Sequence, residues 1–164
     1  MTLFQSRAQA ASDEFAANRS EMLALIGELE ELQGRAVQAS ERRRPRFEER
    51  GQLTPRERLT RILDPGMPFL ELGNMTGYLR DNDDPDKTIP GGSMISGVGF
   101  VSGVRSMVMV DDSGIDAGAM TTSSLKKMLR CQEIALAQRL PFIHLVESAG
   151  ANLMKFHVED WLMG

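Results

Sequence analysis

A loop of small residues behind a short apolar run is the segment of this sequence best suited to chemistry. The segment is LPFIHLVESAGAN, from Leu140 to Asn152. Phe142 to Val146 are too few for a helix and are typical of a buried strand, and the Gly and Ala residues that follow let backbone N–H groups approach a ligand. Such amides stabilise charge developing on an enolate or tetrahedral oxygen. The pattern predicts an anion hole at Ser148, Ala149, Gly150 and Ala151, with a tight strand-to-helix turn as the plainer alternative.

Ser148 also half matches the nucleophile elbow of serine hydrolases, G-x-S-x-G. The first glycine of that motif is missing, because Val146 stands in its place. A nucleophilic serine needs a neighbouring base, and the two histidines of the chain are His144, inside the predicted strand, and His157, beyond the loop. A serine hydrolase is therefore disfavoured.

Arginines cluster around a predicted helix start and could hold a phosphate. ERRRPR at 41–46 forms a basic hinge, and GQLTPRER at 51–58 carries the two candidate phosphate-binding residues, Arg56 and Arg58. Guanidinium groups and helix N-terminal amides both favour anions. The alternative is that these arginines are solvated or paired with nearby glutamates.

A second charged segment, DDSGIDAGAM from Asp111 to Met120, combines acidic residues with glycines. Paired carboxylates suggest a metal site or acid–base chemistry. A turn that caps the next helix is the favoured interpretation, since Asp, Ser and Gly are the usual residues of such turns.

The N-terminal third of the chain is expected to be an amphipathic helix from about Asn18 to Gln38. Met22, Leu25, Ile26, Leu29 and Leu32 recur at helical spacing, and the remaining surface is acidic. This helix needs a partner surface, either its own domain or a sister subunit. Its acidic polar face argues against membrane binding.

Strand and helix patterns alternate in the rest of the chain. Thr54, Pro55 and Glu57 predict a capping box and a short helix that ends before Asp64. A hairpin is predicted from runs 95–101 and 105–111 around the Ser102-Gly103 turn, with its second strand covered on both faces. A helical stripe over 123–138 then leads into the strand at 142–146, so one mixed sheet is expected.

Composition narrows the function classes. The net charge of −4 and the low aromatic content argue against a nucleic-acid binder. The single cysteine, Cys131, excludes a disulfide or a cysteine-rich zinc site within one chain and fits a reducing cytoplasm. No apolar run approaches the length of a membrane span, and the first residues lack a signal-peptide core. We expect a cytoplasmic protein without metal, nucleic-acid or membrane binding.

Several motifs in order resemble a known family. The runs GQLTPRERLTRILDPGMPFLEL and IPGGSMISGVGFVSGVRSMVMVDDSGIDAGAM, followed by the helix and LPFIHLVESAGANL, are similar to the N-terminal part of the carboxyltransferase (β) subunits of biotin-dependent acyl-CoA carboxylases, such as propionyl-CoA and methylcrotonoyl-CoA carboxylases. The resemblance divides the chain into a helical arm with its hinge, residues 1–50, and a partial carboxyltransferase domain, residues 51–164.

The resemblance implies an α/β, crotonase-like fold of stacked ββα units, here incomplete and preceded by an amphipathic helix. It implies transfer of a carboxyl group from carboxybiotin, carried by a biotin carboxylase or carrier subunit, to the α carbon of an acyl-CoA. The biotin ureido anion would remove the α-proton, so no side chain need be the base. Ser148, Ala149, Gly150 and Ala151 would lie beside the thioester, and Gly118 and Ala119 near the CoA-binding wall.

Two departures from the family pattern matter. The family often has SGGAR where this chain has SAGAN, so Ala149 restricts the backbone and Asn152 replaces a cation. The chain also ends at Gly164, where the family continues into a second glycine-pair loop and a second domain. We therefore expect a fragment, truncated or split, that is inactive unless sister subunits or a missing half complete it.

Three functions stay open from the sequence. The first is a component of an acyl-CoA carboxyltransferase, in a homo-oligomer. The second is a non-catalytic remnant that binds CoA thioesters or another subunit. A hydratase or isomerase is third, and the GQLTPRER and DDSGIDAGAM segments argue against it.

Overall fold

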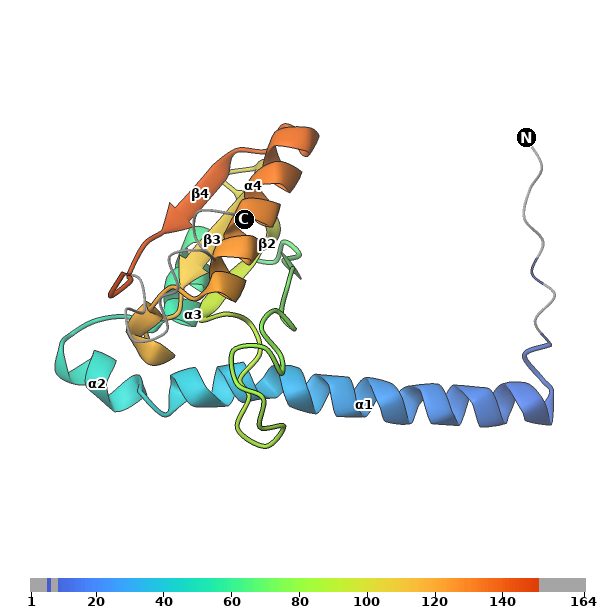
Figure 1. The fold of residues 1–164 in the computed structure, drawn as a ribbon. Coiled ribbons are helices and arrows are strands. Elements are labelled where there is room, and N and C mark those ends of the chain that lie inside the picture. Colours follow the sequence, from blue (N-terminus) through green and yellow to red (C-terminus); the bar gives the residue numbers. More distant parts are fainter. Residues whose placement is uncertain (1–5, 7–8, 151–164) are drawn as a thin grey trace. The chain divides into compact units, whose positions relative to one another are not determined.

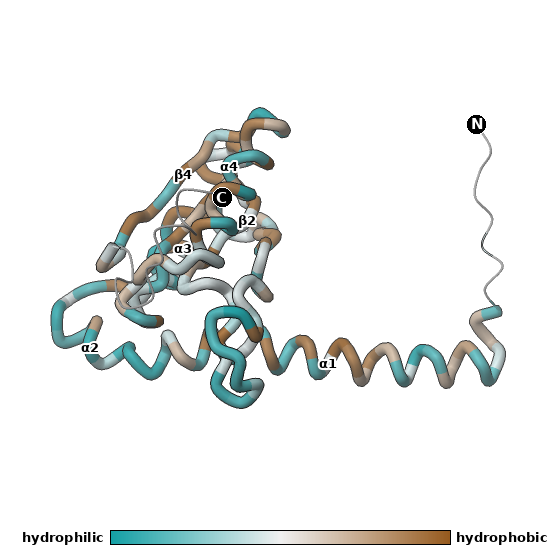
Figure 2. The backbone as a smooth tube through the Cα atoms, viewed as in Figure 1, coloured by the Kyte–Doolittle hydropathy of each residue, from teal (hydrophilic) through white to brown (hydrophobic). Residues whose placement is uncertain are grey.

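The N-terminal helix is longer than its apolar pattern predicts. The computed structural model describes residue 6 and residues 9–150, and the chain divides into two compact units, Met1–Leu32 and Gln33–Gly164. Helix α1 spans Asp13–Glu41, with Asp13 and Glu14 in its first turn, where acidic side chains interact favourably with the helix dipole. In the first unit, apolar residues recur along the helix (Figure 2) and six large ones are exposed: Phe15, Met22, Leu23, Leu25, Ile26 and Leu29.

The basic segment expected as a hinge, residues 41–46, is a turn at Arg42 and Arg43 followed by the start of a second helix. Helix α2 spans Arg44–Glu49 and has Pro45 in its first turn, where a missing backbone N–H costs no hydrogen bond. Its Phe47 is 6% exposed. Burial of this aromatic ring therefore gives the segment a packed, helical conformation that its arginines alone do not indicate.

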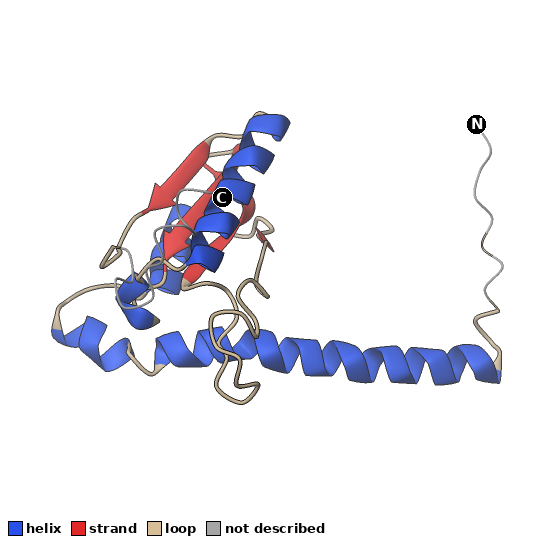
Figure 3. Ribbon diagram, viewed as in Figure 1, coloured by secondary structure: helices blue, strands red, loops and turns tan. Residues whose placement is uncertain are grey.

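A four-stranded sheet forms the body of the second unit, in the order β1-β2-β3-β4 (Figure 3). The strands are β1 (Leu70–Glu71), β2 (Met94–Val101), β3 (Val104–Asp111) and β4 (Phe142–Leu145). β2 and β3 form the predicted antiparallel hairpin, and β4 pairs with β3 in parallel. Ser102 and Gly103 both have positive φ, 50° and 77°, as a tight hairpin turn requires. The mixed sheet is thus confirmed.

Two helices cover opposite faces of this sheet (Figure 1). Residues 107–110 at the centre of β3 are 0% exposed. Met107 and Met109 pack with Cys131 and Ala135 of helix α4 (Thr122–Gln138), while the alternate residues, Val108 and Val110, pack with Leu59 of helix α3 (Pro55–Ile62). The prediction that β3 is covered on both faces is therefore confirmed. β3 is also the element whose end carries the loops described below.

Helix α3 begins with the predicted capping box. The Thr54 hydroxyl accepts a hydrogen bond from the Glu57 N–H, and the Glu57 carboxylate accepts one from the Thr54 N–H. The Arg44 guanidinium also lies 2.7 Å from the Glu57 carboxylate and, together with the capping bonds, lowers the pKa of Glu57 to about 2. Arg44 thus ties the start of α3 to α2.

A buried lysine fixes the chain that enters β2. Lys127 of α4 is 5% exposed, and its Nζ donates to the carbonyl oxygens of Gly91 and Met94 at 3.0 and 2.5 Å. Burial lowers the pKa of Lys127 to about 8. The folded protein therefore holds this proton less tightly than the unfolded chain does, and the free energy of unfolding depends on pH.

We expect the free energy of unfolding of the wild type to rise with pH relative to that of Lys127→Met. Between about pH 8 and 10.5 the unfolded state binds more protons at Lys127 than the folded state, so the wild type gains stability on the order of 2 kcal/mol between pH 7.5 and 10. Urea unfolding at several pH values measures this gain. Lys126→Met, at an exposed neighbour, is the matched control. A pH-independent difference for Lys127→Met would contradict the prediction.

Candidate functional site

Two loops and helix α2 enclose a cavity of ≈ 460 Å³. One loop follows β3 and the other follows β4, and these strands are parallel, so both loops leave the same edge of the sheet. Carboxyl ends of parallel strands are where α/β proteins usually bind ligands. The lining residues are Arg43, Arg46, Phe47, Arg50 and Gln52 on the α2 side, and Ser113, Gly114, Asp116, Ala117, Glu147, Ser148 and Ala149 from the loops.

The two loops are hydrogen-bonded to each other. The Ser148 hydroxyl donates to the Gly118 carbonyl at 2.6 Å, and the Ala149 N–H donates to the Ala117 carbonyl at 3.1 Å. The Met120 N–H donates in turn to the Gly150 carbonyl at 2.8 Å. The structure therefore brings together the two segments that the sequence marks as separate candidates.

The predicted acyl-CoA residues occupy different places in these loops. Ser148 and Ala149 line the cavity. Gly150, Gly118 and Ala119 belong to the same loops but are not among the residues that line it. Ala151 lies outside the described residues. The acyl-CoA role of all of them stays a prediction.

Two amides of the expected anion hole already have acceptors within the protein. The Ala149 N–H bonds to Ala117, and the Gly150 N–H donates to the Ser148 hydroxyl at 3.0 Å. A ligand oxygen would have to replace these acceptors. In this conformation the described part of the loop has the hydrogen bonding of a closed turn. A tight turn was the alternative to an anion hole in the sequence analysis.

The paired carboxylates at the end of β3 point to different partners. Asp111 accepts from the Glu147 N–H at 3.0 Å and lies 2.9 Å from His144 Nε2. Asp112 accepts from the Ser40 hydroxyl at 2.7 Å and from the Gly114 N–H at 3.1 Å. Burial raises the pKa of the Asp112 carboxyl, against the effect of these two hydrogen bonds. Each carboxylate thus binds the backbone of one loop.

The expectation that this acidic loop caps the next helix is wrong. Helix α4 is capped by Thr121, whose hydroxyl accepts from the Ser124 N–H while Ser124 accepts from the Thr121 N–H. Asp116 begins a short 3₁₀ turn, Asp116–Gly118, instead. The acidic residues could not act as the cap because Asp111 and Asp112 are buried at the strand end, ten or so positions before the helix.

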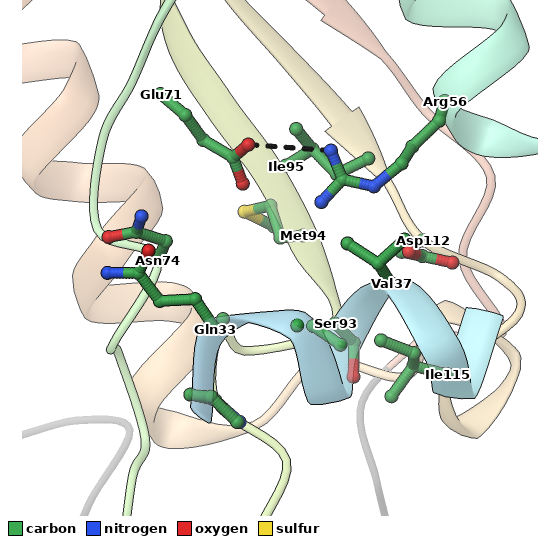
Figure 4. Close-up of a pocket in the computed structure, with 14 residues that line it drawn as sticks. Gln33, Val37, Arg56, Glu71, Asn74, Ser93, Met94, Ile95, Asp112 and Ile115 are labelled. Atoms are coloured by element: carbon green, nitrogen blue, oxygen red, sulfur yellow. Dashed lines mark hydrogen bonds and ion pairs between the residues drawn. The ribbon is translucent and has the colours of Figure 1, made fainter. Parts of the chain in front are cut away.

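Arg56 and Arg58, the predicted phosphate-binding residues, each face a glutamate. Arg56 Nη1 lies 3.4 Å from the Glu71 carboxylate, beside a second cavity of ≈ 200 Å³ (Figure 4). Arg58 forms an ion pair with Glu147. Pairing with glutamates was the alternative left open by the sequence, and these ion pairs do not favour phosphate binding at either residue.

The arginines that line the cavity between the two loops and α2 are different ones. Arg43, Arg46 and Arg50 are exposed and lie around α2. Their spacing, together with Phe47 between them, places them on one face of a helix. That spacing could have revealed the arginine cluster in the sequence. Pro45 and the run of arginines instead favoured a hinge, and residues of a hinge do not share a helix face.

Neither a metal cluster nor a membrane span is present in the part of the chain that the structure describes. Within residues 9–150 no three His, Cys, Asp or Glu side chains are grouped so as to hold a metal ion. No described helix combines the length and the apolar character needed to cross a bilayer.

Comparison with known proteins places the chain in a family. The family model of the carboxyl transferase domain matches residues 46–162. The chain belongs to the carboxyl transferase domain family. A Mycobacterium tuberculosis relative, the biotin-dependent 3-methylcrotonyl-coenzyme A carboxylase beta1 subunit, is 42% identical over 130 residues, which are 79% of this chain and 24% of the relative. The predicted family is thus confirmed.

Solved structures of this carboxyl transferase family confirm the fold class. The beta subunit of geranyl-CoA carboxylase from P. aeruginosa superposes with a TM-score of 0.82 at 43% identity, over 92% of this chain and 28% of that one. Transcarboxylase 12S gives a TM-score of 0.64 at 26% identity, over 94% and 28%. These are crotonase-fold carboxyltransferases. The chain spans about a quarter of the length of such relatives.

We expect Gly118→Ala to separate the two loops of the carboxyl transferase domain. Gly118 has φ +68°, and a Cβ at this position would collide with the Glu147 carbonyl oxygen. Strain and collision together should lower the free energy of unfolding by about 2 to 4 kcal/mol.

Gly66→Ala is the matched control for Gly118→Ala. Gly66 has a similar φ of +75°, but a Cβ at this position would meet no atom within 4 Å. Its replacement should cost only the backbone strain, about 1 kcal/mol. Chemical denaturation of both variants measures the difference, and equal losses would show that the contact between the loops contributes nothing.

Proposed function

We propose that this chain acts as part of the carboxyltransferase subunit of a biotin-dependent acyl-CoA carboxylase, and that the cavity between its loops binds the acyl-CoA. The observation that carries the proposal is the composition of the cavity wall. One side presents three arginines, and the other presents mostly small residues together with Asp116 and Glu147. Coenzyme A carries phosphates at one end and the thioester at the other, so a wall divided in this way suits it.

The two sides of the cavity would do different work. Guanidinium groups of Arg43, Arg46 and Arg50 would bind phosphate oxygens through charge-assisted hydrogen bonds. Ser148 and Ala149, with small side chains, would allow the thioester end to approach the backbone closely. A relative of the same fold, transcarboxylase 12S, was solved with methylmalonyl-coenzyme A bound, which supports a coenzyme A thioester as the class of ligand.

The proposed reaction needs groups beyond the described residues. Carboxybiotin on a biotin carboxylase or carrier subunit would supply the carboxyl group, and we assign no described residue to biotin. Sister subunits in a homo-oligomer, or another carboxyltransferase chain, would complete the site. A reducing cytoplasm is our proposed compartment, consistent with the single, buried and unpaired Cys131.

A second candidate function is CoA-thioester or subunit binding without catalysis. It is favoured by the closed hydrogen bonding of Ala149 and Gly150, which leaves neither amide directed at a ligand. The exposed apolar face of α1, with Met22 and Leu25 57% and 58% exposed, fits a subunit contact. Binding and turnover must therefore be measured separately.

We expect the arginine cluster to bind the phosphates of coenzyme A. Replacing Arg43, Arg46 and Arg50 together by Gln should weaken coenzyme A binding by roughly tenfold or more, because charge-assisted hydrogen bonds to phosphate are worth ~1.5 to 3 kcal/mol each. Isothermal titration calorimetry with coenzyme A measures this loss. Pantetheine, which lacks the phosphates, should bind the variant and the wild type equally.

Arg61→Gln is the control for charge alone. Arg61 is exposed on α3 and does not line this cavity. Its replacement should leave the affinity for coenzyme A within about twofold. An equal loss of coenzyme A affinity in Arg61→Gln would mean that only the overall charge of the protein matters. Undiminished affinity in the triple variant would refute the assignment of the phosphates to α2.

We expect the purified chain alone to carboxylate neither acetyl-CoA, propionyl-CoA nor methylcrotonoyl-CoA with a biotin donor. The loop amides that could stabilise an enolate oxygen are engaged within the protein, and one such donor is worth ~3 to 4 kcal/mol of transition-state stabilisation. Transfer of a radiolabelled carboxyl group from free carboxybiotin to the acyl-CoA, which releases biotin, measures turnover. Activity of the isolated chain would show that this loop opens and that no further chain is needed.

A further inference from the structure

Glu147, the residue before the small-residue loop, is held at both its backbone and its side chain. The Asp111 carboxylate accepts from the Glu147 N–H at 3.0 Å. The Arg58 guanidinium pairs with the Glu147 carboxylate and also donates to the Asp111 carbonyl oxygen at 3.4 Å. Three separate elements, α3, β3 and the loop after β4, therefore meet at one residue.

The tie to Asp111 lies away from solvent. The Asp111 side chain is 5% exposed and the Arg58 side chain 21% exposed. A buried carboxylate without hydrogen-bond donors is costly, so Asp111 favours the loop conformation in which Glu147 supplies its N–H. The second oxygen of Asp111 is 2.9 Å from His144 Nε2, which keeps the carboxylate directed at the end of β4.

A displacement of Glu147 would also move the cavity wall. Ser148 and Ala149 follow it in the chain, line the cavity and bond to Gly118 and Ala117 on the facing loop. Asp111 and Arg58 themselves are not among the residues that line this cavity. Both contact Glu147, which itself lines the cavity, so we expect their influence on a ligand there to act through this residue.

We propose that Asp111 and Arg58 are positioning residues that hold Glu147, and through it Ser148 and Ala149, in the place where they form the wall of the acyl-CoA cavity. The effect on ligand affinity rests on the proposed function. The effect on the loop itself does not, so the two can be tested apart.

The first test follows the loop without a ligand. Amide hydrogen exchange at Ala149 and Gly150, whose N–H groups are bonded in the closed loop, reports its opening. We expect exchange at least tenfold faster in Asp111→Ala, after normalisation to the core amide of Val108. Asp111→Asn should restore most of the protection, because its amide oxygen can still accept from the Glu147 N–H.

Asp64→Ala is the matched control for Asp111→Ala. Like Asp111, the Asp64 carboxylate binds backbone amides, but it accepts from two of them, Ser102 and Gly103 at 2.8 and 2.7 Å, and lies at the other end of the β2–β3 hairpin. The Asp64→Ala substitution should leave amide exchange at Ala149 and Gly150 unchanged. Equal acceleration in both variants would mean that Asp111 acts only through general stability, and the proposal would fall.

Arg58→Met tests the side-chain tie and does not depend on whether Asp111→Ala folds. We expect threefold or greater acceleration of loop exchange and a threefold to tenfold rise in the Kd for coenzyme A, with neither change in Arg61→Met on the same helix. Unchanged loop exchange in Arg58→Met would overturn the proposal. Faster exchange in a chain whose wild type binds no coenzyme A would support the positioning role and refute the proposed ligand.

Discussion

Two adjacent buried carboxylates at the end of β3 determine how the loops of this protein are arranged. Asp111 and Asp112 are 4% and 2% exposed, and a carboxylate so placed must find hydrogen-bond donors. Successive residues of a strand project to opposite sides. Asp111 therefore binds the loop after β4, while Asp112 binds the C-terminal end of α1 and the loop after β3. The cavity lies between the two loops that these bonds fix.

The sheet provides the rigid support for this arrangement. β3 is completely buried at its centre, between α3 and α4, so its end cannot move without disrupting both hydrophobic clusters. Helix α2 and the residues at its two ends then bring three arginines, Arg43, Arg46 and Arg50, to the cavity. A basic wall facing a small-residue wall, on a carboxyl transferase domain, is the physical basis of the proposed acyl-CoA binding.

Local patterns in the sequence predicted most elements of the second unit. The capping box at Thr54, the hairpin around Ser102 and the helical stripe of α4 involve residues close in the chain, so the sequence determines them locally. β1 escaped prediction because two residues carry no period, and its pairing with β2 alone makes it a strand. The partners of Arg56 and Arg58 could not be predicted either, since Glu71 and Glu147 are brought to them by the tertiary fold.

The most direct test of the account is a coenzyme A titration of the ¹⁵N-labelled chain followed by amide chemical shifts. We expect the largest shifts on the two loops, at Ser113, Gly114, Ala117, Ser148 and Ala149. Amides beside the second cavity, such as Asn74 and Ser93, should move little. Shifts confined to that second cavity, or no shifts at millimolar coenzyme A, would contradict it.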